Sequence, residues 1–193
     1  TAAADAVELG RIESATVAEV ASYVLVTSDN AVSEALGRLV AVASGLPGSF
    51  DGATRAITAA VGTLGVDVGA VTLADASGLA DGSTVPATTV VELILALTQP
   101  AHSDGLRALT GLAVAGTSGT LFDRLTSPPA LGVVRAKTGS LRGVTTLAGT
   151  VLTREGRLLA FAVLADQTPE GGQWGPRAAI DVFVQNLAAC GCR

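Results

Sequence analysis

The chain has 193 residues, a net charge of −5 and 49% hydrophobic residues. A chain of this length and apolar content can bury the core of one domain, or of a large part of one. Its negative charge, with no run of basic residues, argues against nucleic acid or an anionic membrane surface as a partner. No apolar stretch reaches the roughly 20 residues that a membrane-spanning helix requires.

The two ends of the chain point to a piece of a longer protein. No methionine is present, so we interpret Thr1 as the start of a processed or excised chain and favour a C-terminal fragment. Cys190 and Cys192 are too few and too close together for a zinc site. We interpret them as surface thiols or, if oxidised, as supplying one disulfide to a segment outside this chain, because a bond between the two would be strained.

The first two predicted helices flank a polar triplet. Thr16-Val17-Ala18-Glu19 is a capping-box pattern, which predicts a helix that ends near Thr27. Ser28-Asp29-Asn30 then falls in a turn, and a second helix follows and stops at residues 45–48. The apolar face predicted for the second helix consists of Leu36, Leu39, Val40 and Ala43. We expect both helices to be buried and to hold the triplet between them.

The next elements are shorter. A third helix is predicted from about Phe50 to Leu64, and Ala70 to Ala74 is a candidate for a short apolar strand. A polar loop from Asp75 to Ser83 follows. Thr89-Val90-Val91-Glu92 is the predicted cap of a helix that runs to Pro100, and Ser103 to Gly111 is a further short helix.

From residue 133 the pattern changes to strands. The runs 133–139, 144–152 and 157–165 are apolar or β-branched and are separated by turns that contain glycine, which predicts an antiparallel meander of three strands. Pro176 is a plausible first position of a closing helix before Gly191. Its predicted apolar stripe consists of Ile180, Phe183, Val184 and Leu187.

The predicted organisation is one folded body of α+β class. Residues 1–132 form a mainly helical region with the Ser-Asp-Asn triplet, and residues 133–193 form the meander and the closing helix. A sheet of three strands is small for this length, so we expect a segment outside the chain to supply further strands.

Ser28 and Asn30 suit one part of acyl-transfer chemistry. Acyl transfer from a peptide needs an activated nucleophile, a proton donor for the leaving amine, and dipoles directed at the tetrahedral oxyanion. A hydroxyl at a helix junction can relay a proton between a lysine and the leaving nitrogen. The Asn30 amide can hold that lysine and the amide oxygen of the substrate, while Asp29 points into the scaffold. We predict catalytic roles for Ser28 and Asn30.

Lys137-Thr138-Gly139-Ser140 suits another part. The motif begins where an apolar strand ends, where a strand can offer its backbone to an extended ligand, and Gly139 has no side chain to obstruct that approach. Lys137 supplies positive charge, and the hydroxyls of Thr138 and Ser140 can bind a C-terminal carboxylate. A backbone amide near Ser140 can point at the oxyanion.

Each motif alone is common, because Ser-Asp-Asn often starts a helix and Lys-Thr-Gly often ends a strand. Their order, their settings and their separation by about a hundred residues make the pair specific. Other candidates are weaker. His102, the only histidine, lies in a polar turn, and Gly116-Thr117-Ser118-Gly119 resembles a nucleophile elbow with no preceding strand. A Ser-His-Asp hydrolase is therefore disfavoured.

Four stretches carry a resemblance to a known family. They are Ser28 to Leu36, Asp75 to Leu79, Val114 to Leu121, and Arg135 to Leu141 with Gly143. On these, the chain resembles the C-terminal portion of penicillin-binding D-alanyl-D-alanine carboxypeptidases of the penicillin-binding protein 4-like kind (peptidase family S13). The resemblance implies a serine β-lactamase/DD-peptidase-like transpeptidase fold, an antiparallel sheet flanked by helices, which is incomplete in this chain.

The same resemblance implies a function. Such an enzyme acts outside the membrane, in the cell wall or periplasmic space or as a secreted protein, where it releases the terminal D-alanine of peptidoglycan stem peptides and is acylated by β-lactams. Carried over, it gives Ser28, Asn30 and Lys137 as catalytic residues. It gives Thr138, Gly139 and Ser140 as substrate-binding residues, and it implies no metal or organic cofactor.

One defining motif of these enzymes, Ser-x-x-Lys, does not occur. Lys137 is the only lysine, and the residue three positions before it is Val134. We hypothesise that an N-terminal segment or partner chain of the same precursor carries Ser-x-x-Lys, and that this chain alone is inactive. The dipeptide Ala80-Asp81 is also less typical of the family, which leaves the role of its loop open.

Two alternative functions share the motifs. A class A β-lactamase has nearly the same spacing but needs a carboxylate that activates the deacylating water, and no glutamate occurs between Glu34 and Glu92. A non-catalytic cell-wall peptide-binding domain would keep the cleft and bind peptide without turnover. A long-lived penicilloyl adduct, rather than rapid hydrolysis, would distinguish the carboxypeptidase from the β-lactamase.

Overall fold

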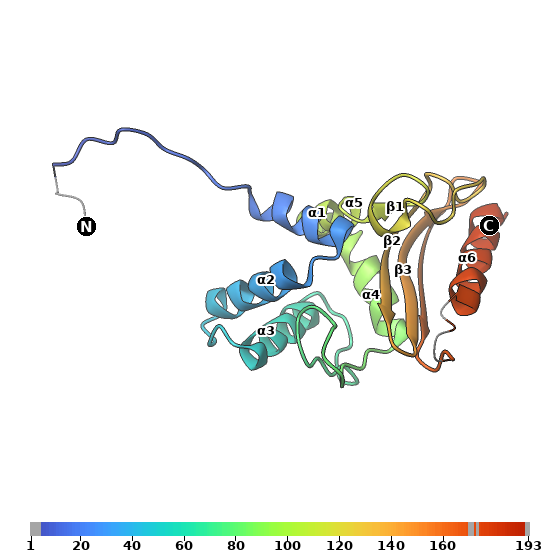
Figure 1. The fold of residues 1–193 in the computed structure, drawn as a ribbon, viewed down its shortest axis with the longest axis horizontal. Helices are drawn as coiled ribbons and strands as arrows, with labels where there is room; N and C mark the ends of the chain where they lie inside the picture. Colours follow the sequence, from blue (N-terminus) through green and yellow to red (C-terminus); the bar gives the residue numbers. More distant parts are fainter. Residues whose placement is uncertain (1–4, 170–171, 173, 192–193) are drawn as a thin grey trace.

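The computed structural model describes residues 5–169, 172 and 174–191. Figure 1 shows a helical part beside a sheet that has helices on both faces. The elements, in chain order, are α1 (Val17–Thr27), α2 (Asn30–Ala43), α3 (Phe50–Thr63), α4 (Ala87–Leu97), the 3-10 helix η1 (Pro100–His102), α5 (Ser103–Thr110), β1 (Ala113–Val114), the 3-10 helix η2 (Gly119–Leu121), β2 (Val134–Leu141), β3 (Val144–Leu152), β4 (Leu158–Ala165) and α6 (Trp174–Ala189).

The sheet has four antiparallel strands in the order β1-β2-β3-β4. The predicted meander is confirmed as β2, β3 and β4, because apolar runs between glycine turns are a strong strand signal. The strand β1 was not predicted; its Ala113 and Val114 pair with Ala136 and Arg135. A strand of two residues is too short to show any alternation of apolar and polar side chains.

The hydrophobic core has two clusters, one on each face of the sheet. Between the sheet and α6, the cluster includes Val134, Leu147, Val151 and Val184, all fully buried. On the opposite face, Ile94 of α4 and residues of the α5 region pack against Ala148 and Ala160. Successive residues of a strand point to opposite faces of the sheet, so Leu147 faces α6 and Ala148 faces α4.

The predicted helices are confirmed at α1, α3, α5 and α6, and the start of α1 has a local cause. Thr16 caps α1 with the predicted capping box, in which its side chain accepts from the Glu19 N–H and the Glu19 side chain accepts from the Thr16 N–H. The third helix and the short helix α5 lie within a residue of their predicted bounds. The closing helix α6 begins at Trp174, two positions before Pro176.

The predicted burial of α1 and α2 is wrong. α1 contains no buried residue, and Leu39 of α2 is 61% exposed. The residues of α2 that are buried are instead Gly37 and Ala41. A Cβ on Gly37 would lie 2.6 Å from the Cβ of Ala76, so small side chains allow close contact here and the larger apolar ones face away.

Three smaller predictions are also wrong. Residues 70–74 form no strand of the sheet, and only an isolated bridge joins Thr72 to Thr84. Thr89 does not cap α4, because Pro86 is the N-cap and the Thr89 hydroxyl donates to the Asp67 carbonyl. Cys190 is disulfide-bonded and not a free thiol, and Cys192 lies outside the described residues.

Candidate active site

Ser28 lies at the junction of α1 and α2 in a left-handed backbone conformation. Its φ and ψ are 60° and 41°, and its N–H donates to the Val24 carbonyl at 2.8 Å, which ends α1. Asp29 then caps α2, because its carboxylate accepts the Val32 N–H at 3.0 Å. Asp29 therefore points into the scaffold, as predicted. A non-glycine residue in this conformation costs about 1 kcal/mol or more and is often found at functional sites.

Lys137 of β2 contacts Ser28 across the fold. Its Nζ atom donates to the Ser28 Oγ atom at 2.7 Å and to the Thr138 carbonyl at 2.8 Å. The Ser-Asp-Asn turn and the Lys-Thr-Gly strand, 109 residues apart in the chain, are thus brought into direct contact. Ser28 and Lys137 form the centre of the candidate site.

The electrostatic state of Lys137 is unusual for a lysine. Its side chain is half-buried, and burial lowers the pKa of its ammonium group below the usual value. Among the described residues, no carboxylate forms an ion pair with it. A cation that has lost water without gaining a counter-charge favours an anionic ligand.

Asn30 is the first residue of α2 and is half-buried, two positions after Ser28. Its predicted contact with Lys137 does not form. The Lys137 ammonium group contacts Ser28 and Thr138 instead, and no hydrogen bond joins the Asn30 amide to another described residue. The amide is therefore available to a ligand that enters beside Ser28.

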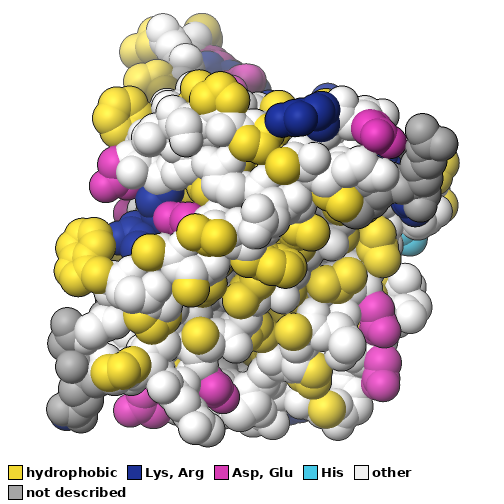
Figure 2. Space-filling view, turned by 90° about the vertical axis from the view of Figure 1, so that its right-hand side faces the viewer, with side chains coloured by type: hydrophobic (Ala, Val, Ile, Leu, Met, Phe, Trp, Pro, Cys, Tyr) yellow, Lys and Arg dark blue, Asp and Glu magenta, His cyan; other side chains and the backbone are white. Residues whose placement is uncertain are grey.

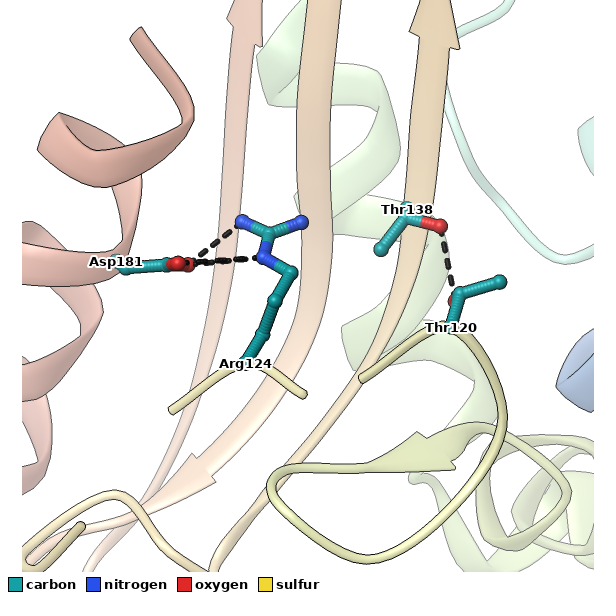
Figure 3. Close-up of polar contacts among 4 residues, drawn as sticks. All are labelled: Thr120, Arg124, Thr138 and Asp181. Carbon is teal, nitrogen blue, oxygen red and sulfur yellow. Dashed lines mark hydrogen bonds and ion pairs between the residues drawn. The ribbon is translucent and has the colours of Figure 1, made fainter. Parts of the chain in front are cut away.

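Thr138 and Lys137 lie on opposite faces of the sheet at the same edge. Lys137 pairs with Ala148, which packs on the α4 side, whereas Thr138 pairs with Leu147 on the α6 side. The Thr138 hydroxyl makes a 2.9 Å hydrogen bond with the hydroxyl of Thr120, which Figure 3 shows. Thr120 was not predicted as a site residue, although its stretch was one of those that resembled the family.

Gly139 and Ser140 continue this edge. A Cβ on Gly139 would collide with the hydroxyl of Thr146, its partner on β3. Glycine at this position thus suits the packing across the sheet, because a larger residue would displace the Thr146 hydroxyl. Ser140 is exposed. Because β1 pairs with residues 135 and 136, the described strands leave the edge of β2 beside 137–139 unpaired.

The loop from Asp75 braces α2. Burial raises the pKa of the Asp75 carboxyl, but hydrogen bonds from the Ala80 and Gly78 N–H groups and the Ser77 hydroxyl outweigh it and hold the pKa below its usual value. Glu34 of α2 accepts the Ala76 and Ser77 N–H groups at 2.9 and 2.8 Å. This loop therefore helps to fix the helix that begins at Asn30.

Residues 116–119, which resemble a nucleophile elbow, follow the strand β1. The prediction that no strand precedes them is therefore wrong. The Ser118 hydroxyl accepts the Val114 N–H at 3.0 Å. This hydrogen bond closes the loop locally. The described residues contain no group of three or more histidine, cysteine or carboxylate side chains that could hold a metal ion.

An antiparallel sheet between helices, with a Ser-Asp-Asn turn against a Lys-Thr-Gly strand, defines the class of serine β-lactamase/DD-peptidase-like folds. The prediction of fold class is confirmed by solved structures of this class. The chain belongs to the D-Ala-D-Ala carboxypeptidase 3 (S13) family, whose model matches residues 1–187.

Individual relatives agree with this family. The chain is 38% identical over 192 residues to carboxypeptidase DacB of Mycolicibacterium smegmatis, which covers 95% of this chain and 40% of the relative. It is 34% identical over 192 residues to a D-alanyl-D-alanine carboxypeptidase of Actinomadura sp., covering 95% of this chain and 34% of the relative.

The solved structure of penicillin binding protein 4 (dacB) from Haemophilus influenzae matches with a TM-score of 0.76 and 31% identity, over 88% of this chain and 38% of that one. A complex of the same protein with a novel β-lactam gives a TM-score of 0.75. The chain thus spans 34–40% of the length of these relatives and structures.

Proposed function

We propose that the chain is the C-terminal part of a serine-type D-alanyl-D-alanine carboxypeptidase that acts on peptidoglycan stem peptides through an acyl-enzyme and binds penicillin. The observation that carries this proposal is the 2.7 Å hydrogen bond between Lys137 Nζ and Ser28 Oγ. It joins a hydroxyl to a half-buried cation, beside a strand edge that an extended peptide can pair with.

In the proposed reaction, a serine of a Ser-x-x-Lys segment outside this chain gives its hydroxyl proton to the lysine of that segment and attacks the carbonyl of the terminal peptide bond. The bond to the D-alanine nitrogen then breaks, and this nitrogen needs a proton to leave. Ser28 donates its hydroxyl proton to the nitrogen and takes one from the Lys137 ammonium group. Asn30, with its free amide, binds the amide oxygen of the substrate.

The other end of the site binds the substrate carboxylate. Lys137 offers positive charge without a carboxylate partner, and the hydroxyls of Thr138 and Ser140 offer hydrogen-bond donors. The backbone beside Gly139 pairs with the extended peptide, and the Ser140 amide stabilises the oxyanion. An oxyanion donor of this kind is worth about 10²–10³ in rate.

Exposed apolar surfaces support a partner segment from the same precursor. β4 pairs only with β3 among the described strands, and a free apolar strand edge is a template for another strand. The outer side of α6 exposes Trp174, Val182 and Phe183, and Figure 2 shows hydrophobic side chains spread over the α6 side of the molecule. A segment that carries Ser-x-x-Lys would cover these surfaces, together with the apolar side of α2 on which Leu39 and Val42 are exposed, and complete the site.

The proposed substrate places the enzyme outside the cytoplasmic membrane, in the cell wall or periplasmic space or as a secreted protein. Within the described part of the chain, no helix has the length and apolar character to cross a membrane.

The structure gives a reason to prefer penicillin binding over β-lactamase activity. Glu34 is the glutamate nearest to Ser28 in the following helix, and its Oε1 atom is committed to the Ala76 and Ser77 N–H groups. Its Oε1 atom thus braces a loop, and its Oε2 atom is buried, so we expect Glu34 not to activate a deacylating water and the penicilloyl adduct to be long-lived.

The test is acylation of the native full-length protein by labelled penicillin, followed by peptide mapping. We expect label on a peptide outside residues 1–193, and a loss of at least about a hundredfold in acylation or turnover for Lys137→Met and Ser28→Ala. Ser14→Ala is the matched control, because Ser14 is exposed and its hydroxyl contacts only the neighbouring Ala15 carbonyl.

Other outcomes would overturn the proposal in different ways. Label on Ser28 would make Ser28 and Lys137 a nucleophile and its base, an arrangement that other serine enzymes use. Peptide binding with no label on any segment would favour the non-catalytic peptide-binding domain. Rapid release of hydrolysed penicillin would favour a β-lactamase.

A further inference from the structure

A single loop contacts both halves of the candidate site. We call residues 116–124 the bridging loop. Gly119 in this loop has a φ of 54°, and a Cβ there would collide with the Val26 carbonyl. Val26 lies in the last turn of α1, two positions before Ser28. The bridging loop thus packs directly on the backbone that carries the serine.

The next residue of the bridging loop, Thr120, contacts the Lys-Thr-Gly strand. The Thr120 hydroxyl lies 2.9 Å from the Thr138 hydroxyl, and Leu121, which follows it, is fully buried in the core beneath α6. The packed neighbour therefore holds the backbone at Thr120, and the hydrogen bond with Thr138 orients the Thr120 hydroxyl.

The end of the bridging loop is anchored on α6. Arg124 donates to Asp181 with distances of 2.6 Å from Nη2 and 3.2 Å from Nε, as Figure 3 shows. The Arg124 side chain is only 5% exposed and that of Asp181 is 24% exposed. The two other ion pairs found among the described residues are exposed on both sides.

We propose that Thr120 is a positioning residue for the substrate carboxylate, and that the Arg124–Asp181 pair holds it in place. This inference rests on the proposed function, in which Thr138 binds the carboxylate. A threonine hydroxyl has one proton and can accept as well as donate. In the structure, the Thr138 hydroxyl donates to the Thr120 hydroxyl. When Thr138 donates its proton to a carboxylate instead, this hydrogen bond reverses and Thr120 donates its own proton to Thr138 Oγ1.

This arrangement gives a chain of hydrogen bonds from Thr120 through Thr138 to the carboxylate. Successive hydroxyls polarise one another, so each bond in such a chain is stronger than it would be alone. It also orients the Thr138 side chain, whose rotation would otherwise move the donor away from the ligand. Thr120 touches no reacting atom, and it acts through Thr138.

The experiment compares two substrates of the full-length protein. One is a D-alanyl-D-alanine peptide with a free C-terminal carboxylate, and the other is the same peptide with an amidated C-terminus. For Thr120→Val, which removes the hydroxyl and keeps the shape, we expect kcat/KM for the free peptide to fall about five- to tenfold, the worth of one hydrogen bond. The value for the amidated peptide should not change.

Two further variants control for folding. Thr120→Ser keeps the hydroxyl and should retain the preference for the carboxylate. Thr117→Val makes the same substitution in the same loop, where the hydroxyl contacts only the Ala115 carbonyl, and should leave both values unchanged.

The outcomes separate this inference from the proposed function. Equal losses on both peptides for Thr120→Val would show a merely structural role and would overturn the inference, as would no loss on either peptide. A wild-type protein that neither cleaves the peptides nor is acylated by penicillin would overturn the proposed function, and this inference with it.

Discussion

The sheet part and the helical part of this molecule differ in how completely they are packed. In the sheet part, Val134, Leu147 and Val184 are fully buried between β2, β3 and α6. In the helical part, α1 buries no residue and α2 buries only Gly37 and Ala41. Lys137 therefore lies on a strand that is packed against a buried core, whereas Ser28 lies between helices whose larger apolar side chains are partly or largely exposed. The two halves of one candidate site thus differ in how deeply the elements that carry them are buried.

The largest expected effect compares leucines from the two parts. Leu147→Ala should lower the free energy of unfolding of this chain by about 3–4 kcal/mol, because it leaves a cavity in a closed core. Leu39→Ala should change it by less than about 0.5 kcal/mol, because Leu39 is largely exposed. Urea denaturation of both variants measures the difference.

The same pair tests the proposed partner segment. In the full-length protein, where we expect α2 to be covered, Leu39→Ala should cost about 2 kcal/mol. A cost as small as in the isolated chain would show that the apolar side of α2 is solvent-exposed in the whole protein, contrary to the proposal.

The next largest effect on stability compares one ion pair of the sheet part with one of the helical part. Asp181→Ala should destabilise the protein by about 3 kcal/mol, because it leaves the buried Arg124 without its counter-charge. Asp51→Ala, which breaks the exposed pair with Arg55 on α3, should cost less than about 1 kcal/mol. Thermal or urea unfolding that gave equal costs would contradict the view that α6 is anchored by a buried charge.

A smaller effect is expected at the start of α1. Thr16→Ala removes the capping box and should weaken the helix by about 1 kcal/mol. Because α1 buries no side chain, faster amide exchange should be confined to residues 17–27 and absent from β2 to β4. Thr63→Ala, an exposed threonine near the end of α3, is the control. Faster exchange throughout the sheet would mean that the two parts unfold together.

The smallest expected effect is a change in the free energy of unfolding with pH. Burial lowers the pKa of Lys137 in the folded state, whereas in the unfolded chain it is about 10.4. At pH values between the folded-state pKa and the unfolded-state pKa, Lys137 is protonated more in the unfolded chain than in the folded one. The free energy of unfolding should therefore rise as the pH is raised through that window. Denaturation of wild type and Lys137→Met at several alkaline pH values measures this, and a slope that persisted in Lys137→Met could not come from this lysine.

The sequence was most informative where one local pattern determines an element. The strands β2 to β4 follow apolar runs between glycine turns, and α1 follows a capping box that Thr16 and Glu19 form by themselves. The pairing of Ser28 with Lys137 could be expected because both motifs recur together in one kind of enzyme. Neither helix periodicity nor residue spacing would have revealed a contact across 109 residues.

The remaining features depend on tertiary packing. The α2 prediction followed its large apolar residues, but contact with the loop at Ala76 requires the small side chain at Gly37. The hydrogen bond between Thr120 and Thr138 joins two hydroxyls, which produce no hydrophobic pattern. The Arg124–Asp181 pair joins residues 57 positions apart, and nothing in the sequence distinguishes these charges from exposed ones.

The backbone conformation at Ser28 lowers stability, while its side chain supplies the hydroxyl proposed to take part in the reaction. Its φ of 60° suits glycine, and Ser28→Gly would relieve about 1 kcal/mol of strain while it removes the hydroxyl that Lys137 contacts. Laboratory selection for thermal resistance alone would therefore favour glycine at this position. If Ser28 has the proposed catalytic role, selection that also demanded turnover would retain serine, and the residue recovered at position 28 would report which of the two properties had been selected.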